Sequence, residues 1–118
     1  MQLNYDKNNV FAKILRGEIP AKKVYENDYA LAFFDIAPVA PTHILVIPKG
    51  EYVNFSDFIQ NARPDEISGY YIAAEETAKI AGVSEYRIVS NSGKSSGQTV
   101  FHFHTHIIAG KILGGFAG

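Results

Sequence analysis

The chain has 118 residues, 47% of them hydrophobic and 19% charged, and its 11 basic and 12 acidic side chains leave a formal charge of −1. This length suits a single domain, residues 1–118, and the charge balance argues against nucleic acid or an anionic membrane as partner. The absence of cysteine excludes disulfide bonds, a thiolate nucleophile and cysteine-bound zinc. Without an apolar run as long as a signal-peptide core or a membrane span, we expect a soluble, cytoplasmic protein.

The first half of the chain predicts a short helix followed by three strands. The helix is expected over 10–16, where the apolar residues fall on one side. Segments 22–27 and 29–36 are predicted to pair as a hairpin around an Asn-Asp turn. The apolar run 42–47, between two prolines that favour extended backbone, is predicted to be a buried strand.

The second half predicts one main helix and two further strands. Over 64–81 small and apolar residues recur at steps of four and three, which indicates an amphipathic helix; its seam is Ile67, Tyr71, Ala74, Ala78 and Ala81. This helix is expected to lie on the sheet or on the same helix of a second copy. Strands are predicted over 86–91 and 99–110, so the fold class is α+β with a five-stranded antiparallel sheet.

Three of the four histidines alternate in the last predicted strand, at His102, His104 and His106. Side chains alternate faces along a strand, so the three imidazoles are expected to project to one side, neighbours ~7 Å apart, toward solvent or a cleft. Like charges at that spacing disfavour one another, which favours neutral imidazoles. The opposite side of the strand is suited to the core and consists of Phe101, Phe103, Thr105 and Ile107.

Three interpretations suit such a row of imidazoles. A solvated edge strand is the first, although three alternating histidines rarely arise by chance. The second is a zinc site that uses an alternating histidine pair, with His43 or Asp35 as a further ligand. The third is covalent catalysis, in which one imidazole attacks phosphorus while the others orient it, bind phosphate oxygens or protonate the leaving group.

The loop before this strand favours phosphate chemistry. Its sequence, NSGKSSGQT over 91–99, combines glycines, which let backbone N–H groups approach an anion, with hydroxyl side chains that add donors. It is not a Walker A motif, because position 88, where the first glycine would stand, is Ile88. Next to a row of histidines, an anion cradle explains this composition better than a flexible turn.

The segment HFHTHII, residues 102–108, resembles the motif of the histidine triad (HIT) superfamily, in which three histidines alternate with apolar residues. Segments 10–28, 31–49 and 91–111 are similar to the corresponding blocks of its Hint branch, the purine nucleoside phosphoramidases. The resemblance implies a HIT-like fold with a short N-terminal helix, one main helix and five antiparallel strands. It also implies a homodimer in which the sheets of two copies join.

The resemblance implies a hydrolase that cleaves the P–N bond of purine nucleoside 5′-phosphoramidates through a nucleotidyl-histidine intermediate, without a cofactor or a metal. His104 would be the nucleophile and His102 would orient it. His106 would bind the phosphate oxygens and His43 would complete the imidazole network. Thr99, where the Hint branch usually has serine, would place a hydroxyl near the leaving group.

The same resemblance implies the substrate-binding residues. Asp35 would accept hydrogen bonds from the ribose hydroxyls, and Asn91, Gly97 and Val100 would contact the phosphate. Five apolar residues would enclose the purine: Phe11, Ile14, Phe33, Ile36 and Leu45. The residue types alone favour ordinary core positions for Phe11, Ile14, Ile36 and Leu45, and Asp35 could equally cap a turn.

Three residues depart from the family pattern, and two other functions stay open. Thr105 occupies a slot that is normally apolar, where we expect an effect on packing. Phe34 replaces a histidine common in animal Hint proteins, and Thr99 adds a methyl group to the usual hydroxyl. The alternative functions are a dinucleoside polyphosphate hydrolase, and a nucleotide-binding or interaction module whose hydrolysis is incidental.

Overall fold

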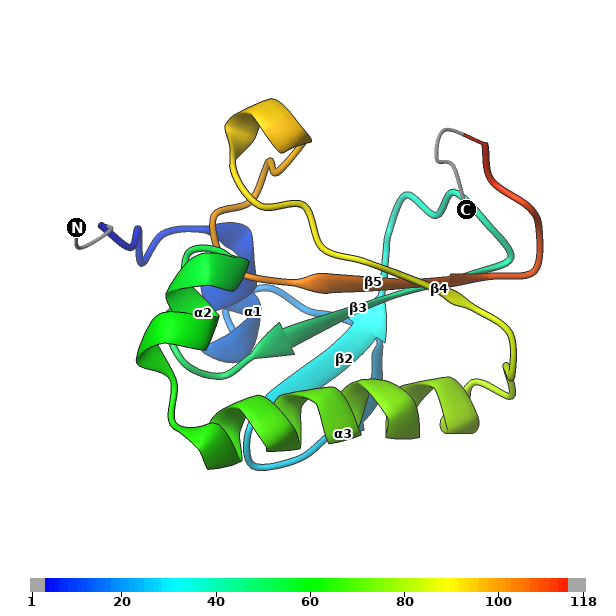
Figure 1. The fold of residues 1–118 in the computed structure, drawn as a ribbon, viewed down its shortest axis with the longest axis horizontal. Coiled ribbons are helices and arrows are strands. Elements are labelled where there is room, and N and C mark those ends of the chain that lie inside the picture. The colour runs from blue at the N-terminus through cyan, green and yellow to red at the C-terminus, as the bar shows by residue number, and fades with distance from the viewer. Residues whose placement is uncertain (1–3, 115–118) are drawn as a thin grey trace.

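The computed structural model describes residues 4–114, so both ends of the expected domain, 1–3 and 115–118, lie outside the described residues (Figure 1). The chain forms, in order, α1 (Val10–Leu15), β1 (Lys23–Glu26), β2 (Ala30–Phe34), β3 (Thr42–Pro48), α2 (Phe55–Asn61), α3 (Pro64–Ile80), β4 (Arg87–Val89), a 3₁₀ turn (Lys94–Ser96) and β5 (Thr105–Ala109). Within this part of the chain, no helix is both long and apolar enough to cross a membrane.

One sheet of five antiparallel strands, counted over residues 4–114, runs in the order β1-β2-β3-β5-β4. The last strand therefore inserts between β3 and β4, and the predicted α+β class with a five-stranded antiparallel sheet is confirmed. The predicted hairpin turn forms because the Asn27 side chain accepts the backbone N–H groups of Tyr29 (2.8 Å) and Ala30 (2.9 Å).

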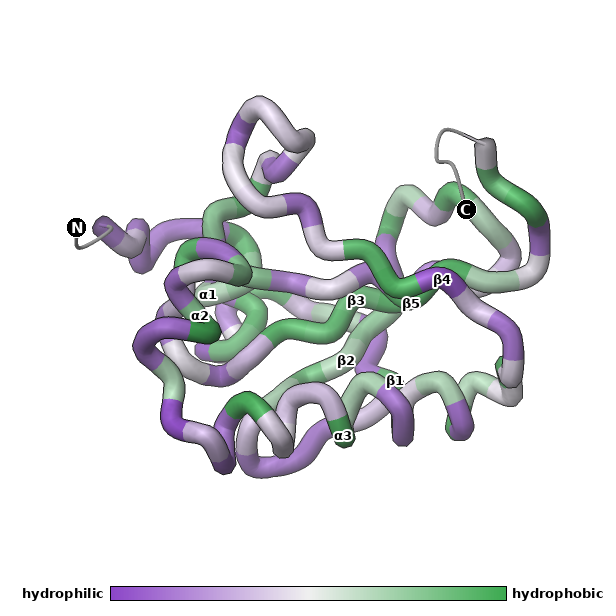
Figure 2. Tube along the Cα trace, viewed as in Figure 1, coloured by the Kyte–Doolittle hydropathy of each residue, from purple (hydrophilic) through white to green (hydrophobic). Residues whose placement is uncertain are grey.

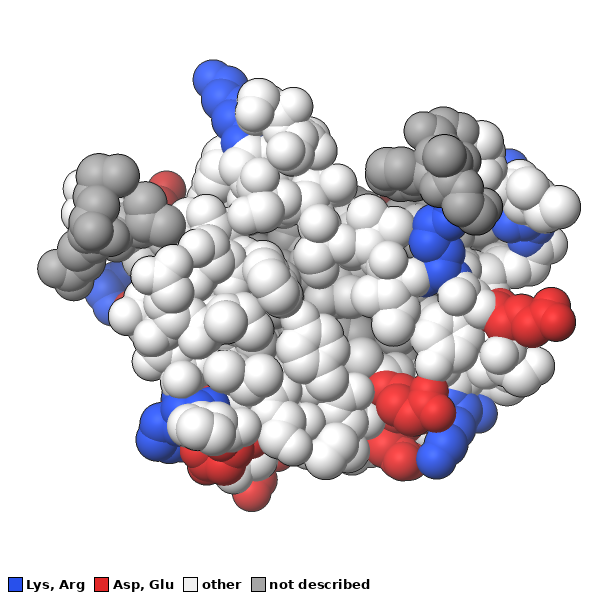
Figure 3. Space-filling model, in the orientation of Figure 1, with Lys and Arg blue, Asp and Glu red and all other residues white. Residues whose placement is uncertain are grey.

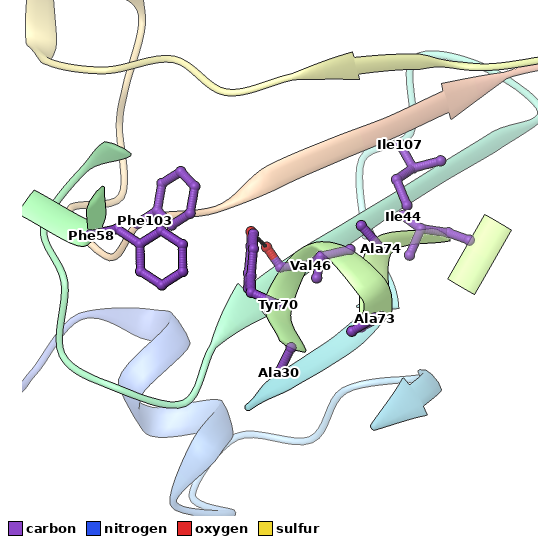
Figure 4. Close-up of a cluster of buried hydrophobic side chains, with 10 residues drawn as sticks. Ala30, Ile44, Val46, Phe58, Tyr70, Ala73, Ala74, Phe103 and Ile107 are labelled. Carbon is purple, nitrogen blue, oxygen red and sulfur yellow. Dashed lines mark hydrogen bonds between the residues drawn. The ribbon is translucent and has the colours of Figure 1, made fainter. Parts of the chain in front are cut away.

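Helix α3 covers one face of the sheet, across β1, β2 and β3 (Figure 1). Its small side chains let it approach the strands closely, and the core beneath it includes Ile44, Val46 and Ile107 (Figure 4). Of the two alternatives, the sheet is thus the surface that this helix covers. The buried face is Tyr70, Ala73, Ala74, Thr77 and Ala78, which is rotated from the predicted seam and leaves Ile67, Tyr71 and Ala81 only partly buried.

Helix α2 was not expected from the sequence, because a seven-residue helix offers too few turns for a periodic pattern. Its local signal is Asn54, whose side chain accepts the N–H of Asp57 (2.9 Å) and caps the first turn. The helix places Phe58 against the ring of Phe103, with centroids 4.9 Å apart (Figure 4).

The last strand is shorter than the sequence predicted. Strand β5 begins at Thr105, and residues 99–104 lie outside it. Pro48 has no N–H to continue the ladder, and its carbonyl accepts from the His102 ring. The N–H of Phe103 donates to the carbonyl of Tyr52 (2.7 Å), outside the sheet. The segment that carries His102 and His104 is therefore an irregular entry to the strand.

The second face of the sheet packs against α1. Its core consists of Phe11, Leu31, Phe33, Leu45 and Ile47, separate from the core beneath α3. The apolar strands stand out in the middle of the molecule (Figure 2), whereas charged side chains on the face shown in Figure 3 gather around its rim. The α1 face is the one to which His43, His104 and His106 belong.

Candidate active site

A cavity of about 310 Å³ opens on the α1 face, between α1, the end of β2 and the segment that leads into β5. Ten of the residues that the sequence assigned to the site line it: Phe11, Ile14, Phe33, Asp35, Ile36, Leu45, Thr99, Val100, His104 and His106. Most of the wall is apolar, and the polar groups gather at one end. Such a cavity suits a ligand with a flat apolar part and a charged part.

Four residues assigned to the site do not line this cavity. His43 and His102 lie behind its wall, where they contact His106 and His104 respectively. Asn91 and Gly97 lie near each other in the loop before β5, since a Cβ built on Gly97 would be 3.9 Å from Cγ of Asn91.

His104 presents an unprotonated nitrogen to the cavity. Its Nδ1 lies 2.8 Å from the carbonyl oxygen of His102. A carbonyl can only accept, so the proton is on Nδ1 and the lone pair is on Nε2. Burial lowers the pKa of His104, which keeps the ring neutral, and the Phe11 ring fixes it edge-on with centroids 5.0 Å apart. A neutral imidazole held in this tautomer is a nucleophile.

His102 does not face the cavity, and the expectation that all three imidazoles project into a cleft is wrong for this residue. It is fully buried, and its Nε2–H donates to the carbonyl of Pro48 (2.8 Å). The reason is the irregular backbone before β5, which turns this ring toward the end of β3. His102 contacts the nucleophile through its main-chain carbonyl, and burial lowers the pKa of its ring to about 4.

The hydrogen bond between His43 and His106 has a defined donor and a defined acceptor. The N–H of Val39 donates to Nδ1 of His43 (3.2 Å), so the His43 proton is on Nε2, which lies 2.9 Å from Nδ1 of His106. Nδ1 of His106 therefore accepts, and its Nε2 carries a proton. Burial first, then the neighbouring imidazoles, lowers the pKa of His106 to about 4. In a neutral ring, that Nε2–H is a donor for an anionic group.

The carboxylate of Asp35 lies at the mouth of the same network. One oxygen accepts the N–H of Ala37 (2.8 Å), and the other lies 3.4 Å from Nε2 of His43. The side chain is 18% exposed and lines the cavity. Both interpretations of this residue are thus compatible with the geometry, because the carboxylate holds a turn and still presents an edge to a ligand.

Gln98 organises the loop before β5, although the sequence interpretation gave it no role. Its side-chain oxygen accepts the N–H of Gly93 (2.8 Å), and its amide donates to the carbonyls of Val53 (2.7 Å) and Val100 (3.0 Å). The side chain is buried, so these bonds fix the base of the loop. Gly97 has φ +100°, a conformation that favours glycine.

Other contributors lack a chemical signature in the sequence. Val10, Ile19, Pro20 and Ala21 line the cavity, and the last three belong to a stretch that carries no periodic pattern of its own. Their position within the family-like segment 10–28 was the only signal for them. Their contribution to the wall depends on the tertiary path of the chain after α1.

A metal ion was an alternative for these histidines, and within residues 4–114 one cluster has the right composition. Ligand atoms of Asp35, His43 and His106 lie within 4.8 Å of one another. A metal at Nε2 of His43 would move the His43 proton to Nδ1, where it would face the N–H of Val39, and two buried donors that face each other are unfavourable. The cluster also contains only one triad histidine, so it is not the alternating pair that a strand site would use. These hydrogen bonds suit imidazoles that hold their protons at fixed nitrogens better than imidazoles that bind a metal ion.

Fold and site together define an α+β protein with an open antiparallel sheet and a histidine network at the start of its inserted last strand. The HIT domain family matches residues 16–112, and the chain belongs to this family. An uncharacterized 13.2 kDa HIT-like protein of Azospirillum brasilense is 57% identical over 116 residues, which cover 97% of this chain and 95% of that protein.

Solved structures give the same family. A histidine triad protein from Clostridium difficile matches with a TM-score of 0.84 and 41% identity, over 97% of this chain and 100% of that chain. A HIT family hydrolase from Legionella pneumophila matches with a TM-score of 0.81 and 40% identity, over 89% of this chain and 95% of that chain.

Proposed function

We propose that this chain is a single HIT domain that acts in the cytoplasm as a hydrolase of purine nucleoside 5′-phosphoramidates. The observation that carries the proposal is the free Nε2 of His104, which is held at the polar end of an apolar cavity. The Legionella relative, described as a HIT family hydrolase, supports hydrolysis as the reaction class. Cleavage of the P–N bond in particular is our inference from the family resemblance.

The proposed reaction has two steps. Nε2 of His104 attacks the α-phosphorus, a P–Nε2 bond forms, and the P–N bond breaks while the departing amine takes up a proton from solvent. Water then attacks the phosphorus and gives up a proton to solvent, the P–Nε2 bond breaks, and the nucleoside monophosphate is released. Attack makes the His104 ring cationic, which strengthens the hydrogen bond from its Nδ1–H to the His102 carbonyl. That bond therefore stabilises the transition state more than the ground state.

The cavity supplies a place for each part of the substrate. Phe11, Phe33, Leu45 and Asp35 line the cavity. In this proposal the three apolar side chains would form walls for the base, and Asp35 would accept the ribose hydroxyls. His106 would donate its Nε2–H to a phosphate oxygen. Thr99 would add its hydroxyl at the leaving-group side, while Asn91, Gly97 and the backbone around Val100 would complete the phosphate site.

We also propose the homodimer that the resemblance implies, with two sheets joined edge to edge. Strand β4 is an outer strand of the sheet, and its Ile88 side chain is 52% exposed. An apolar residue on an unpaired strand edge is suited to pairing with a second chain. Ile72 and Ile80 of α3, each more than half exposed, would add further apolar area.

The decisive test is the His104→Ala variant together with trapping of the intermediate. We expect turnover of AMP linked to an amine to fall at least about a thousandfold, because the nucleophile is lost, while AMP binding by calorimetry persists. Rapid quenching of the wild-type reaction should show an adenylyl group on His104 by peptide mass spectrometry.

Turnover at the wild-type rate in His104→Ala, or a label on another residue, contradicts the mechanism. A parallel assay with a diadenosine polyphosphate separates the substrates, because the same attack there expels a phosphate. Faster cleavage of the polyphosphate would assign the chain to that alternative. A cellular role that the His104→Ala variant still fulfils would indicate a binding module.

A further inference from the structure

Tyr5 contacts the histidine network from a distant part of the sequence. Its hydroxyl lies 2.5 Å from Nδ1 of His102, 97 residues along the chain, and the two rings pack edge to face with centroids 5.6 Å apart. Since Nε2 of His102 donates to the carbonyl of Pro48, Nδ1 of the neutral ring has the lone pair. The Tyr5 hydroxyl is therefore the donor in this bond.

We propose that Tyr5 is a positioning residue for the reaction, which holds His102 so that its carbonyl keeps the His104 nucleophile in the reactive tautomer. This inference rests on the proposed function. The path is continuous: the Tyr5 hydroxyl donates to the His102 ring, and the His102 carbonyl accepts from Nδ1 of His104 at 2.8 Å. Tyr5 does not line the cavity and would not touch the substrate.

Loss of the Tyr5 hydroxyl would leave Nδ1 of a fully buried ring without a donor. The ring can recover a partner only by turning within its pocket, because a proton moved to Nδ1 would find no acceptor there and would set the Nε2 lone pair against the Pro48 carbonyl. Such a turn would also displace the backbone of His102, and with it the carbonyl that orients His104.

The N-terminal segment stays in place without this hydroxyl, which makes the test specific. The guanidinium of Arg16 donates to the carbonyl of Lys7 (2.7 Å), and Asn9 caps α1 by accepting the N–H of Ala12 (2.9 Å). Phe11, farther along the same segment, packs against the His104 ring. Figure 1 shows this segment, in blue, beside α1 at the end of the sheet where β5 begins.

The test is Tyr5→Phe, which keeps the ring and removes the donor. We expect kcat for an AMP-linked amine to fall roughly tenfold with KM changed less than about twofold, because small displacements of a reacting group reduce rate while the pocket is intact. The matched control is Tyr29→Phe, which removes a hydroxyl that donates to Asp65 (3.2 Å) away from the cavity. Its kinetics should equal the wild type.

Nitrogen-15 NMR of the imidazoles in the free enzyme gives a readout that needs no substrate. In the wild type, His102 should show a hydrogen-bonded, unprotonated Nδ1, and His104 should show a protonated Nδ1 with an unprotonated Nε2. Tyr5→Phe should shift the His102 Nδ1 resonance and add a second tautomer to His104, whereas Tyr29→Phe should change neither.

Unchanged kcat with unchanged imidazole spectra in Tyr5→Phe would overturn the proposal. A loss of activity that only follows the folded fraction, with both histidine spectra as in the wild type, would also overturn it and leave Tyr5 a purely structural role. If wild-type enzyme fails to cleave the phosphoramidate, the proposed function fails, and the NMR comparison still decides whether Tyr5 sets the two tautomers.

Discussion

The two sides of the segment 103–107 carry polar networks of opposite design. On the α1 side, His104 and His106 keep one nitrogen each directed to a cavity, while their other nitrogens are bonded within the protein. On the α3 side, Thr105 lies among hydroxyl groups that bond only to one another and to backbone. Within residues 4–114 every fully buried side-chain nitrogen and oxygen has a hydrogen-bond partner. A site differs from a structural network by the hydrogen-bonding capacity that it leaves open to a ligand.

In the hydroxyl network, the donors and acceptors can be assigned from one end. Tyr70 lies 2.7 Å from the Val46 carbonyl and 2.8 Å from the Thr105 hydroxyl, which in turn lies 3.0 Å from the Ser90 hydroxyl. The carbonyl can only accept, so the single hydroxyl proton of Tyr70 serves Val46, and Thr105 then donates to the phenol oxygen. Thr105, which departs from the family pattern, is thus fully bonded in the core, and its effect is one of packing and hydrogen bonding away from the cavity.

The largest difference between the networks should appear when a support on the imidazole side is removed. His43→Ala should lower kcat roughly 100-fold, because His106 loses the donor that keeps its proton on Nε2. Steady-state kinetics measures this effect, and thermal unfolding checks the fold. Thr42→Ala, the preceding residue on β3 with its side chain on the other face, is the control and should keep kcat within about twofold. Equal losses in both variants would show that the effect is not specific to the imidazole.

On the hydroxyl side the same kind of change should affect stability and leave catalysis intact. Tyr70→Phe removes the partner of a buried carbonyl and a buried hydroxyl, and should lower the free energy of unfolding by about 2–3 kcal/mol. Denaturant unfolding measures this, and kcat per folded molecule should stay within about twofold.

Thr105→Val is the matched control for Tyr70→Phe. It removes the hydroxyl at the other end of the same bond, but Tyr70 keeps its bond to Val46 and the partly buried Ser90 can turn to water. We expect a loss below about 1 kcal/mol. A tenfold fall of kcat in either variant would contradict the separation of the two sides.

A smaller difference between the two sides should appear in the stability at acidic pH. Of the two networks, only the one with imidazoles contains groups that titrate between pH 7 and 5. The folded-state pKa of His102 is about 4 and its ordinary value is 6.5, so its contribution to stability is complete above about pH 6.5 and is lost as the pH falls toward 4. At pH 5 the loss from this residue is about 2 kcal/mol. Unfolding measured from pH 7 to 5 should show this slope, and His102→Gln should reduce it by about 2 kcal/mol at pH 5, while the share of His106, whose pKa is also about 4, stays. The same slope in both proteins would assign it to other groups.

The strands and α3 were predictable from the sequence because their hydrophobic patterns are long or strongly marked. The sequence also predicted that Phe101, Phe103, Thr105 and Ile107 face the core. The last three are buried, but the prediction is wrong for Phe101, which is 39% exposed and lies in the irregular segment before β5. The sequence missed the break before β5, since the pattern alternates through His102 while Pro48 on the neighbouring strand ends the ladder. That cause lies in the partner strand, and a single-strand pattern cannot contain it.

The site was predictable as a list of chemical groups, whereas their connections were not. Histidines and an aspartate have a recognisable chemistry, and Asp35, His104 and His106 line one cavity. The orientation of His102 depends on Pro48 and Tyr5, which contact it through a carbonyl and a hydroxyl from remote parts of the chain. Gln98 was overlooked for the same reason, because its three bonds go to backbone groups.

The backbone amide of Val39 determines which substitutions the protein tolerates at this position. His43 is the donor and His106 the acceptor in their hydrogen bond because a main-chain N–H, that of residue 39, donates to His43. The side chain at position 39 is 49% exposed and can vary without exchanging donor and acceptor. Only proline takes that hydrogen away. Conventional alanine scanning would therefore score this position as silent, although the path of the backbone there dictates which way the protons point.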